Sequence, residues 1–136
     1  MKTTQISPLA AVQQIYTWFG EGNIPAILDM LTENVLWKHA GDHNVIPFAG
    51  TFHGKAGALD FFQKLGGSYQ ITEFEPHNFS ANGLIVTNDV HVSGTVISTE
   101  KTARLTSHFT WMFNEEGKVF SWEMTGDTHE LDMAFH

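Results

Sequence analysis

Residues 103–125 read ARLTSHFTWMFNEEGKVFSWEMT, and this stretch decides the fold. Large apolar residues alternate with small or polar ones on both sides of a turn sequence at 114–117. A period of two is typical of β-strands with one buried face, so the stretch predicts a β-hairpin. The residues expected on its inner face are Leu105, Ser107, Phe109, Trp111, Phe113, Phe120, Trp122 and Met124.

Two further strands are predicted directly upstream. Residues 69–79 and 84–96 have strand-like composition, and Asn82-Gly83 between them is a hairpin turn signal. A polar turn at 98–101 then leads into the hairpin, so residues 69–125 predict a four-stranded meander. The residues expected to face inward in its second strand are Val86, Asn88, Val90 and Val92.

The first half of the chain predicts helices and one strand. Ser7-Pro8 is a helix start, because a hydroxyl cap precedes proline at the first helical position, and Asn23 caps a second, short helix. The elements expected after it are a strand at 34–39, a loop at 40–54, a third helix at 55–65 and, at the end of the chain, a fraying tail at 131–136.

The buried faces of these elements follow from the same spacing arguments. The helix residues expected to point inward are Leu9, Val12, Ile15, Tyr16, Phe19, Ile24, Ile27, Leu28, Leu31, Leu59, Phe62 and Leu65. In the strand, Lys38 indicates water on one face, so Val35, Trp37 and His39 share the other. The element order predicts the α+β class, with helices gathered on one face of the sheet.

The bulk composition bounds the class of protein. The chain has 136 residues, the usual size of one domain, so we expect a single domain spanning 1–136. Its net charge of -8 disfavours nucleic acid and anionic membranes as partners. It contains no cysteine and no apolar segment long enough for a signal peptide or a membrane span, so we expect a soluble, cytoplasmic protein.

Four short stretches together span nearly the whole chain. They are Val12 to Asn23, Trp37 with Ile46 to Gly54, Phe113 to Val119, and Asp127-Thr128. Their order and spacing resemble the nuclear transport factor 2-like superfamily, in its branch of ketosteroid isomerases and SnoaL-like polyketide cyclases. The resemblance implies a cystatin-like fold, in which a curved, mostly antiparallel sheet carries three helices on its concave face and forms a cone-like pocket. It says little about the substrate, because one fold hosts many unrelated functions.

The catalytic groups of ketosteroid isomerase match this chain only in part. By the resemblance, the position of its catalytic Asp falls on His39. Its oxyanion-binding Tyr falls on Ile15, next to Tyr16, and its protonated Asp falls on Phe109. Histidine can also act as a general base, with an unperturbed pKa of about 6.5. The resemblance therefore implies the scaffold of that isomerase without its steroid chemistry.

His39 is the main candidate for chemistry. It lies on the predicted inner face at the end of a strand, and Asp42, three residues on, could orient its imidazole or balance its charge. The alternative is a pocket-rim histidine bonded to a backbone carbonyl.

Other residues are candidates for binding a substrate. Tyr16, Asn88 and Ser107 could hydrogen-bond to a substrate carbonyl, or could be core residues whose polar groups are satisfied. Asp127 follows the last inner strand, where a turn residue for the tail is the simpler interpretation. The aromatic residues expected to line the pocket are Trp37, Phe48, Phe62, Phe109, Trp111 and Trp122.

No metal and no cofactor are expected. The chain has eight histidines, but His39, His43 and His53 lie in a strand and a loop without a spaced ligand motif. Phosphate-binding glycine loops, a nucleophile elbow and a dinucleotide fingerprint are also absent from the sequence.

Three interpretations of function remain open. The first is a cofactor-free enzyme of isomerase, cyclase, dehydratase or epoxide hydrolase type, in which His39 takes a proton from a small apolar, carbonyl-like substrate. The second is a ligand-binding or carrier domain with the same pocket and no chemistry. The third is a dimeric interaction module whose cavity is simply core. Outward-facing His91, His108 and Met112 favour a homodimer through the outer sheet face.

Overall fold

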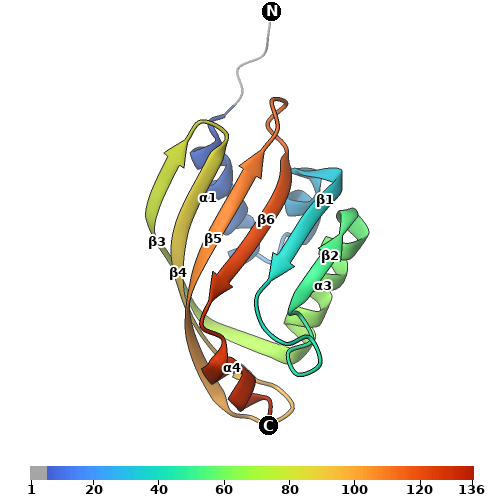
Figure 1. Cartoon of the computed structure of the whole chain (residues 1–136), viewed down its shortest axis with the longest axis vertical. Helices are drawn as coiled ribbons and strands as arrows, with labels where there is room; N and C mark the ends of the chain where they lie inside the picture. The colour runs from blue at the N-terminus through green and yellow to red at the C-terminus, as the bar shows by residue number, and fades with distance from the viewer. Residues whose placement is uncertain (1–5) are drawn as a thin grey trace, which may run out of the picture.

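The computed structural model describes residues 6–136, which form a six-stranded sheet with helices packed on it (Figure 1). The strands lie in the order β2-β1-β6-β5-β4-β3, and only β1 and β6 run parallel among these neighbours. The predicted α+β fold with a mostly antiparallel sheet is therefore confirmed. The elements are α1 (Pro8–Gly20), α2 (Ile24–Asp29), β1 (Leu31–His39), β2 (Gly50–His53), α3 (Gly54–Ser68), β3 (Tyr69–Asn82), β4 (Ile85–Val96), β5 (Thr102–Phe113), β6 (Val119–Gly126) and α4 (His129–Ala134).

The first two helices begin where the sequence predicts. The Ser7 hydroxyl accepts a hydrogen bond from the Ala10 N–H at 3.1 Å, and the Asn23 side chain accepts one from the Ala26 N–H at 3.3 Å. These caps satisfy backbone donors that a helix start leaves free. Figure 1 shows α1 and α3 on the same side of the sheet. Within residues 6–136, no helix is both long enough and apolar enough to cross a membrane.

The sheet brings together strands that are distant in the sequence. β3 to β6 form the predicted meander, and every residue expected to face inward on β4 and β5 is buried. β1 then pairs with β6 in parallel, which places Trp37 beside Trp122. Trp122 in turn pairs with Trp111, so tryptophans from three strands form one row across the inner face.

Phe120 does not follow the alternation that was expected of β6. Phe113 pairs with Val119 whereas Met112 pairs with Ser121, so β6 holds one extra residue at this point. A β-bulge of this kind disturbs the pleat and changes which side chains point inward. Val119 is therefore buried, whereas Phe120 remains 43% exposed.

Four expectations for the first half of the chain are also wrong in detail. Gly50–His53 is a strand rather than loop, because it pairs with β1. α3 continues through Gly66-Gly67, since neither glycine takes a positive φ that would end it. Its inner face is rotated, so that Phe61 is buried while Leu59 is 38% exposed. Leu31 is buried, but as the first residue of β1.

The end of the chain is helical rather than frayed. α4 buries Leu131 and Ala134. The Thr99 hydroxyl donates to the Ala134 carbonyl, and Lys101 Nζ donates to the His136 carbonyl at 3.0 Å. These contacts hold α4 next to the turn between β4 and β5, at one end of the sheet (Figure 1).

Candidate functional site

A small apolar cavity lies between the inner face of the sheet and the helices. The centre of a water-sized sphere can occupy about 70 Å³ of it, and no Asp, Glu, Lys or Arg among residues 6–136 lines it. Most of the residues that the sequence predicts for the pocket do line it. They are Tyr16, Trp37, His39, Phe48, Phe62, Phe109, Trp111 and Trp122.

Cross-strand pairing orders the inner face of the sheet into two rows. One row consists of Trp37, Trp122 and Trp111. The next row consists of His39, Met124, Phe109 and Asn88. Because neighbouring strands are about 4.8 Å apart, His39 and Asn88 lie at opposite ends of their row, roughly 14 Å from each other.

His39 has one ring nitrogen bound and the other free. Its Nδ1 lies 2.7 Å from the Ala40 carbonyl oxygen, and because a carbonyl only accepts, we assign the proton to Nδ1. Burial lowers the pKa of His39 from 6.5 to about 4, against a smaller opposing effect of the Ala40 hydrogen bond. The imidazole is therefore neutral at neutral pH. Its Nε2 has no hydrogen-bond partner among residues 6–136 and keeps a free lone pair.

Aromatic rings enclose the His39 imidazole. Phe48 meets it edge-on, with the ring centroids 5.2 Å apart, and the rings of Phe61 and Trp122 lie at 5.8 Å and 6.2 Å. This apolar shell removes the imidazole from water, which disfavours its charged form. The pKa in the folded protein therefore departs from the unperturbed value on which the sequence argument relied.

Tyr16, Asn88 and Trp111 form one chain of hydrogen bonds. The Tyr16 hydroxyl accepts from Trp111 Nε1 at 3.0 Å and donates to Asn88 Oδ1 at 2.7 Å. Asn88 Nδ2 donates to the Asp89 carbonyl at 3.0 Å. Burial raises the pKa of Tyr16 well above its ordinary value, although both of its hydrogen bonds oppose this. While the chain of bonds is intact, the Tyr16 proton is held by Asn88 and is not offered to a ligand.

Tyr69 is a second hydroxyl in the cavity wall, and sequence reasoning missed it. It donates to the Ala103 carbonyl at 2.8 Å, and burial raises the pKa of Tyr69 to about 12, with a further contribution from Glu130. Its ring lies against Gly94, where a Cβ would come within 2.6 Å of Tyr69 Cζ. A glycine on the inner face of β4 was the available signal, because a missing side chain makes room for a ring.

Comparison with known families identifies the architecture around this cavity. Residues 12–122 match the SnoaL-like domain family, and they include every aromatic residue predicted for the pocket. The chain belongs to the SnoaL-like domain family.

Solved structures of the nuclear transport factor 2-like superfamily share the fold of this SnoaL-like domain. An NTF2-like protein from Burkholderia xenovorans LB400 is 27% identical, with a TM-score of 0.85 and 95% of each chain covered. Another from Burkholderia thailandensis E264 is 21% identical, with a TM-score of 0.86 over 97% of this chain and 99% of that one. TerC, co-crystallised with polyporic acid, is 24% identical, with a TM-score of 0.80 over 95% and 98%. None of the curated proteins matches the chain.

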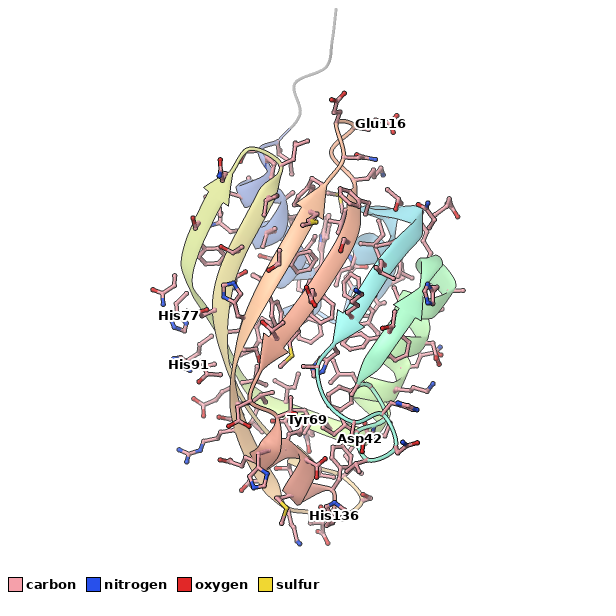
Figure 2. All side chains as sticks on the ribbon, in the orientation of Figure 1. Asp42, Tyr69, His77, His91, Glu116 and His136 are labelled. Carbon is pink, nitrogen blue, oxygen red and sulfur yellow. The ribbon has the colours of Figure 1, made fainter. Side chains whose placement is uncertain are left out.

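Four predicted site residues of the SnoaL-like domain do not line the cavity, and Asn88 is one of them. Asp42 lies in the exposed loop between β1 and β2 (Figure 2), where its carboxylate accepts from the Asn44 N–H at 2.9 Å. Asp127 accepts from the His129 N–H at 2.9 Å. Both are local turns typical of Asp. Ser107 is buried on the inner face of β5, outside the cavity lining. Within residues 6–136, no three His, Asp or Glu side chains are grouped so that they could hold a metal ion.

Phe61 and Leu131 line the cavity and were also missed. Phe61 contacts the rings of His39 and Trp37, because α3 presents a different face from the one expected. Leu131 reaches the cavity from α4, which the sequence argument treated as a tail. The helical spacing of Leu131, Ala134 and Phe135 was the signal that could have found it.

Two donors in the wall of the SnoaL-like cavity lack partners. The indole Nε1 atoms of Trp37 and Trp122 are buried, and neither makes a hydrogen bond within the described residues. Leaving a buried donor unpaired costs about 1–3 kcal/mol, so such groups call for an explanation. Both rings line the cavity, with Trp37 on the same strand as His39 and Trp122 on the adjacent strand.

Proposed function

We propose that this SnoaL-like domain binds a small apolar, carbonyl-like molecule and, without a cofactor, uses His39 to take a proton from it. The observation that carries the proposal is the neutral His39 imidazole, which lines an otherwise apolar cavity and whose Nε2 has no hydrogen-bond partner among residues 6–136. A neutral imidazole with one free nitrogen is a proton acceptor. The unpaired Nε2 supports a ligand group as its missing partner.

The lowered basicity of His39 is compatible with proton transfer. The Asp that serves as general base in ketosteroid isomerase, whose position resembles that of His39, works with a pKa of about 4.6. Unlike an aspartate, His39 becomes a cation when it accepts the proton. The substrate anion formed beside it then stabilises that cation, because opposite charges attract more strongly in an apolar cavity than in water. Proton transfer therefore creates an ion pair between His39 and the substrate.

The hydroxyl groups of the cavity wall are not free to bind a developing oxyanion. The hydroxyl protons of Tyr16 and Tyr69 are already bound to Asn88 and to the Ala103 carbonyl. We therefore expect a substrate that spreads its own negative charge, such as a 1,3-dicarbonyl or polyketide-like compound. Its C–H bond is far more acidic than that of a simple ketone, which suits a weak base. Isomerisation and ring-closing reactions both begin with such a step.

Thermal unfolding with added ligands tests the binding step. The screen compares 1,3-dicarbonyls, polyketide fragments, steroids, epoxides and polyporic acid. A ligand that binds only the folded state stabilises it by about 2.7 kcal/mol at a hundredfold excess over its Kd. If no compound of any class raises the Tm, the binding proposal loses its support.

A pair of variants tests the chemical step on whichever ligand binds. His39→Phe replaces the base with a ring of similar size, whereas Asp42→Asn alters only the exposed loop. We expect His39→Phe to keep binding and to lose turnover, and Asp42→Asn to keep both. Unchanged turnover in His39→Phe would remove His39 from the mechanism, and reduced turnover in Asp42→Asn would restore Asp42 to it.

A non-catalytic ligand-binding or carrier domain is the second candidate. Two features favour it: the low pKa of His39, and the Tyr16 hydroxyl proton that is already donated to Asn88. Both groups resist a change of protonation. In that case Nε2 accepts a hydrogen bond from a hydroxyl group of the ligand. His39→Phe then weakens binding of hydroxylated ligands, and no bound compound is converted by the unmodified protein.

We also propose that the outer sheet face pairs with a second copy of the chain. On this face, Ile85 is 41% exposed and pairs with Met112 of β5. Met112 in turn pairs with Ser121 of β6, and Ser121 directly follows the exposed Phe120. Along the same strands, His108 Nδ1 donates to Asp89 Oδ1 at 2.8 Å. An exposed apolar patch rimmed by polar groups is typical of an interface.

A further inference from the structure

An open groove runs beside the cavity, between α1 and β3. The same water-sized sphere can occupy about 530 Å³ of it, compared with about 70 Å³ in the cavity. In the part of the chain that the structure describes, no Asp, Glu, Lys or Arg lines the groove. Four residues line both spaces and therefore form the wall between them. These residues are Tyr16, Phe19, Ile71 and Phe74.

The members of this wall are not held equally firmly. Tyr16 is fixed by its hydrogen bonds to Trp111 and Asn88. Phe74 is held by ring packing, with its centroid 5.1 Å from Phe19 and 5.5 Å from Tyr16. Packing contacts of this kind can be exchanged for contacts with a ligand ring, whereas the hydrogen bonds of Tyr16 would be lost.

The strand that carries Phe74 is hydrogen-bonded to fewer neighbours than the four inner strands of the sheet. β3 is at the edge of the sheet, so it is hydrogen-bonded to one neighbour only. Its register with β4 shifts between Ile71 and Glu73 and again between His77 and Ser80, on either side of Phe74. Interrupted pairing on one edge is a feature of regions with low local stability.

A second wall, near α4, is a poorer route into the cavity. Val92 and Leu105 line both the cavity and another groove, whose rim includes Arg104 and Glu130. However, Val92 and Leu105 pair with each other across β4 and β5, in the middle of the sheet. They cannot separate unless that ladder opens, and charged groups at the rim disfavour an apolar ligand.

The cavity is too small for an aromatic ligand unless one of its walls moves. An engineered cavity that binds benzene in another protein has about 150 Å³, and the cavity here is smaller. On the basis of the proposed ligand cavity, we propose that Phe74 is the specificity-determining residue of this site. Its ring, packed on Phe19, is the movable wall between groove and cavity and sets the size of the molecule that enters.

Tryptophan fluorescence tests this wall without any ligand. Three of the four tryptophans line the cavity and Trp18 does not, so in a Trp18→Phe background all tryptophan emission comes from the cavity wall. Acrylamide, a small neutral quencher, must approach these rings closely. Phe74→Ala is expected to raise its quenching constant several-fold.

Phe62→Ala is the matched control, because it removes the same ring from the α3 side of the cavity, away from the groove. It is expected to raise quenching clearly less. Equal quenching in the two variants overturns the proposal. Near-ultraviolet circular dichroism verifies that each variant is folded, and Phe74→Leu replaces Phe74→Ala if the latter unfolds.

Neutral hydroxyarenes of one, two and three rings then test the size limit. Phe74→Ala is expected to shift the preferred ligand toward more rings, whereas Phe52→Ala, which removes a ring that lines neither the cavity nor the groove, keeps the preference of the unmodified protein. An unchanged preference in Phe74→Ala overturns the specificity role. If quenching rises in Phe74→Ala but no ligand binds any variant, the wall is supported and the proposed function fails.

Discussion

At the scale of single residues, the state of His39 depends on two neighbours of different kinds. The aromatic shell keeps its ring neutral, and the Ala40 carbonyl fixes the proton on Nδ1. The first effect comes from side chains and the second from the backbone. Substitution can therefore change the basicity of His39 without changing which nitrogen carries the proton.

The lowered pKa of His39 predicts a loss of stability in mild acid. Above pH 6.5 the folded and unfolded states both hold it neutral. As the pH falls from 6.5 to 4, the unfolded state takes up a proton that the folded state does not, which costs about 3 kcal/mol by pH 4. His39→Phe should remove this part of the pH dependence. Urea unfolding at pH 7.5 and pH 4.5 measures the difference.

The exposed loop histidine His43 provides the control for that measurement. His43→Phe should keep the pH dependence of the unmodified protein. Equal pH dependence in the unmodified protein and His39→Phe would show that His39 titrates normally in the fold.

The hydrogen bonds of Tyr16 predict an unequal effect of two similar substitutions. Tyr16→Phe leaves Asn88 Oδ1 and Trp111 Nε1 without the hydroxyl that pairs them, whereas Tyr69→Phe removes only the bond to the Ala103 carbonyl. Each buried group that loses its partner costs about 1–3 kcal/mol. Tyr16→Phe should therefore lower the free energy of unfolding about twice as much as Tyr69→Phe does. Urea titrations of both variants measure this. A larger loss in Tyr69→Phe would contradict the hydrogen-bond chain.

At the scale of elements, two substitutions in α4 test whether this helix packs against the rest of the protein. Leu131 is fully buried and lines the cavity, while Met133 on the same helix is 53% exposed. Leu131→Ala should cost about 2–5 kcal/mol of unfolding free energy, and Met133→Ala less than about 0.5 kcal/mol. Chemical denaturation measures both. Similar small losses would mean that α4 is detached in solution.

Alternation in the sequence is sufficient where a strand runs without interruption. On β4 and β5 it placed every inner residue correctly, because these two strands pair with each other without a register shift. It failed at Phe120, since the bulge there arises from pairing with β5. It also missed β2, which has only four residues and exists because it pairs with β1.

Part of the candidate site could also be predicted from the sequence. His39 and the aromatic wall follow from strand periodicity together with the family resemblance. The bonds that join Tyr16 to Asn88 and Trp111 could not be predicted, because their partners are 72 and 95 residues away. The pKa of His39 was out of reach for the same reason, since Trp122 and Phe48 come from other parts of the chain.

At the scale of the whole molecule, the proposed homodimer predicts the effect of a charge on the outer face. Sedimentation equilibrium should give twice the chain mass of 15.2 kDa for the unmodified protein. Phe120→Glu should give the single-chain mass, because a buried, unpaired carboxylate opposes association.

Leu59→Glu is the control for the dimer, since Leu59 is similarly exposed but lies on α3. It should leave the mass unchanged. A single-chain mass for the unmodified protein would contradict the dimer directly, and a doubled mass for Phe120→Glu would place the interface elsewhere.

The parallel pairing of β1 with β6 has a consequence for synthesis on the ribosome. Trp37 and its neighbour Trp122 are separated by roughly 85 residues, and translation adds about 5–20 residues per second, so β1 waits roughly 4–17 s for its partner. During that time its tryptophan face has no strand to cover it on that side. A nascent chain of this kind depends on chaperones until its last strand emerges, so the speed of translation can limit the yield of folded protein even when the finished fold is stable.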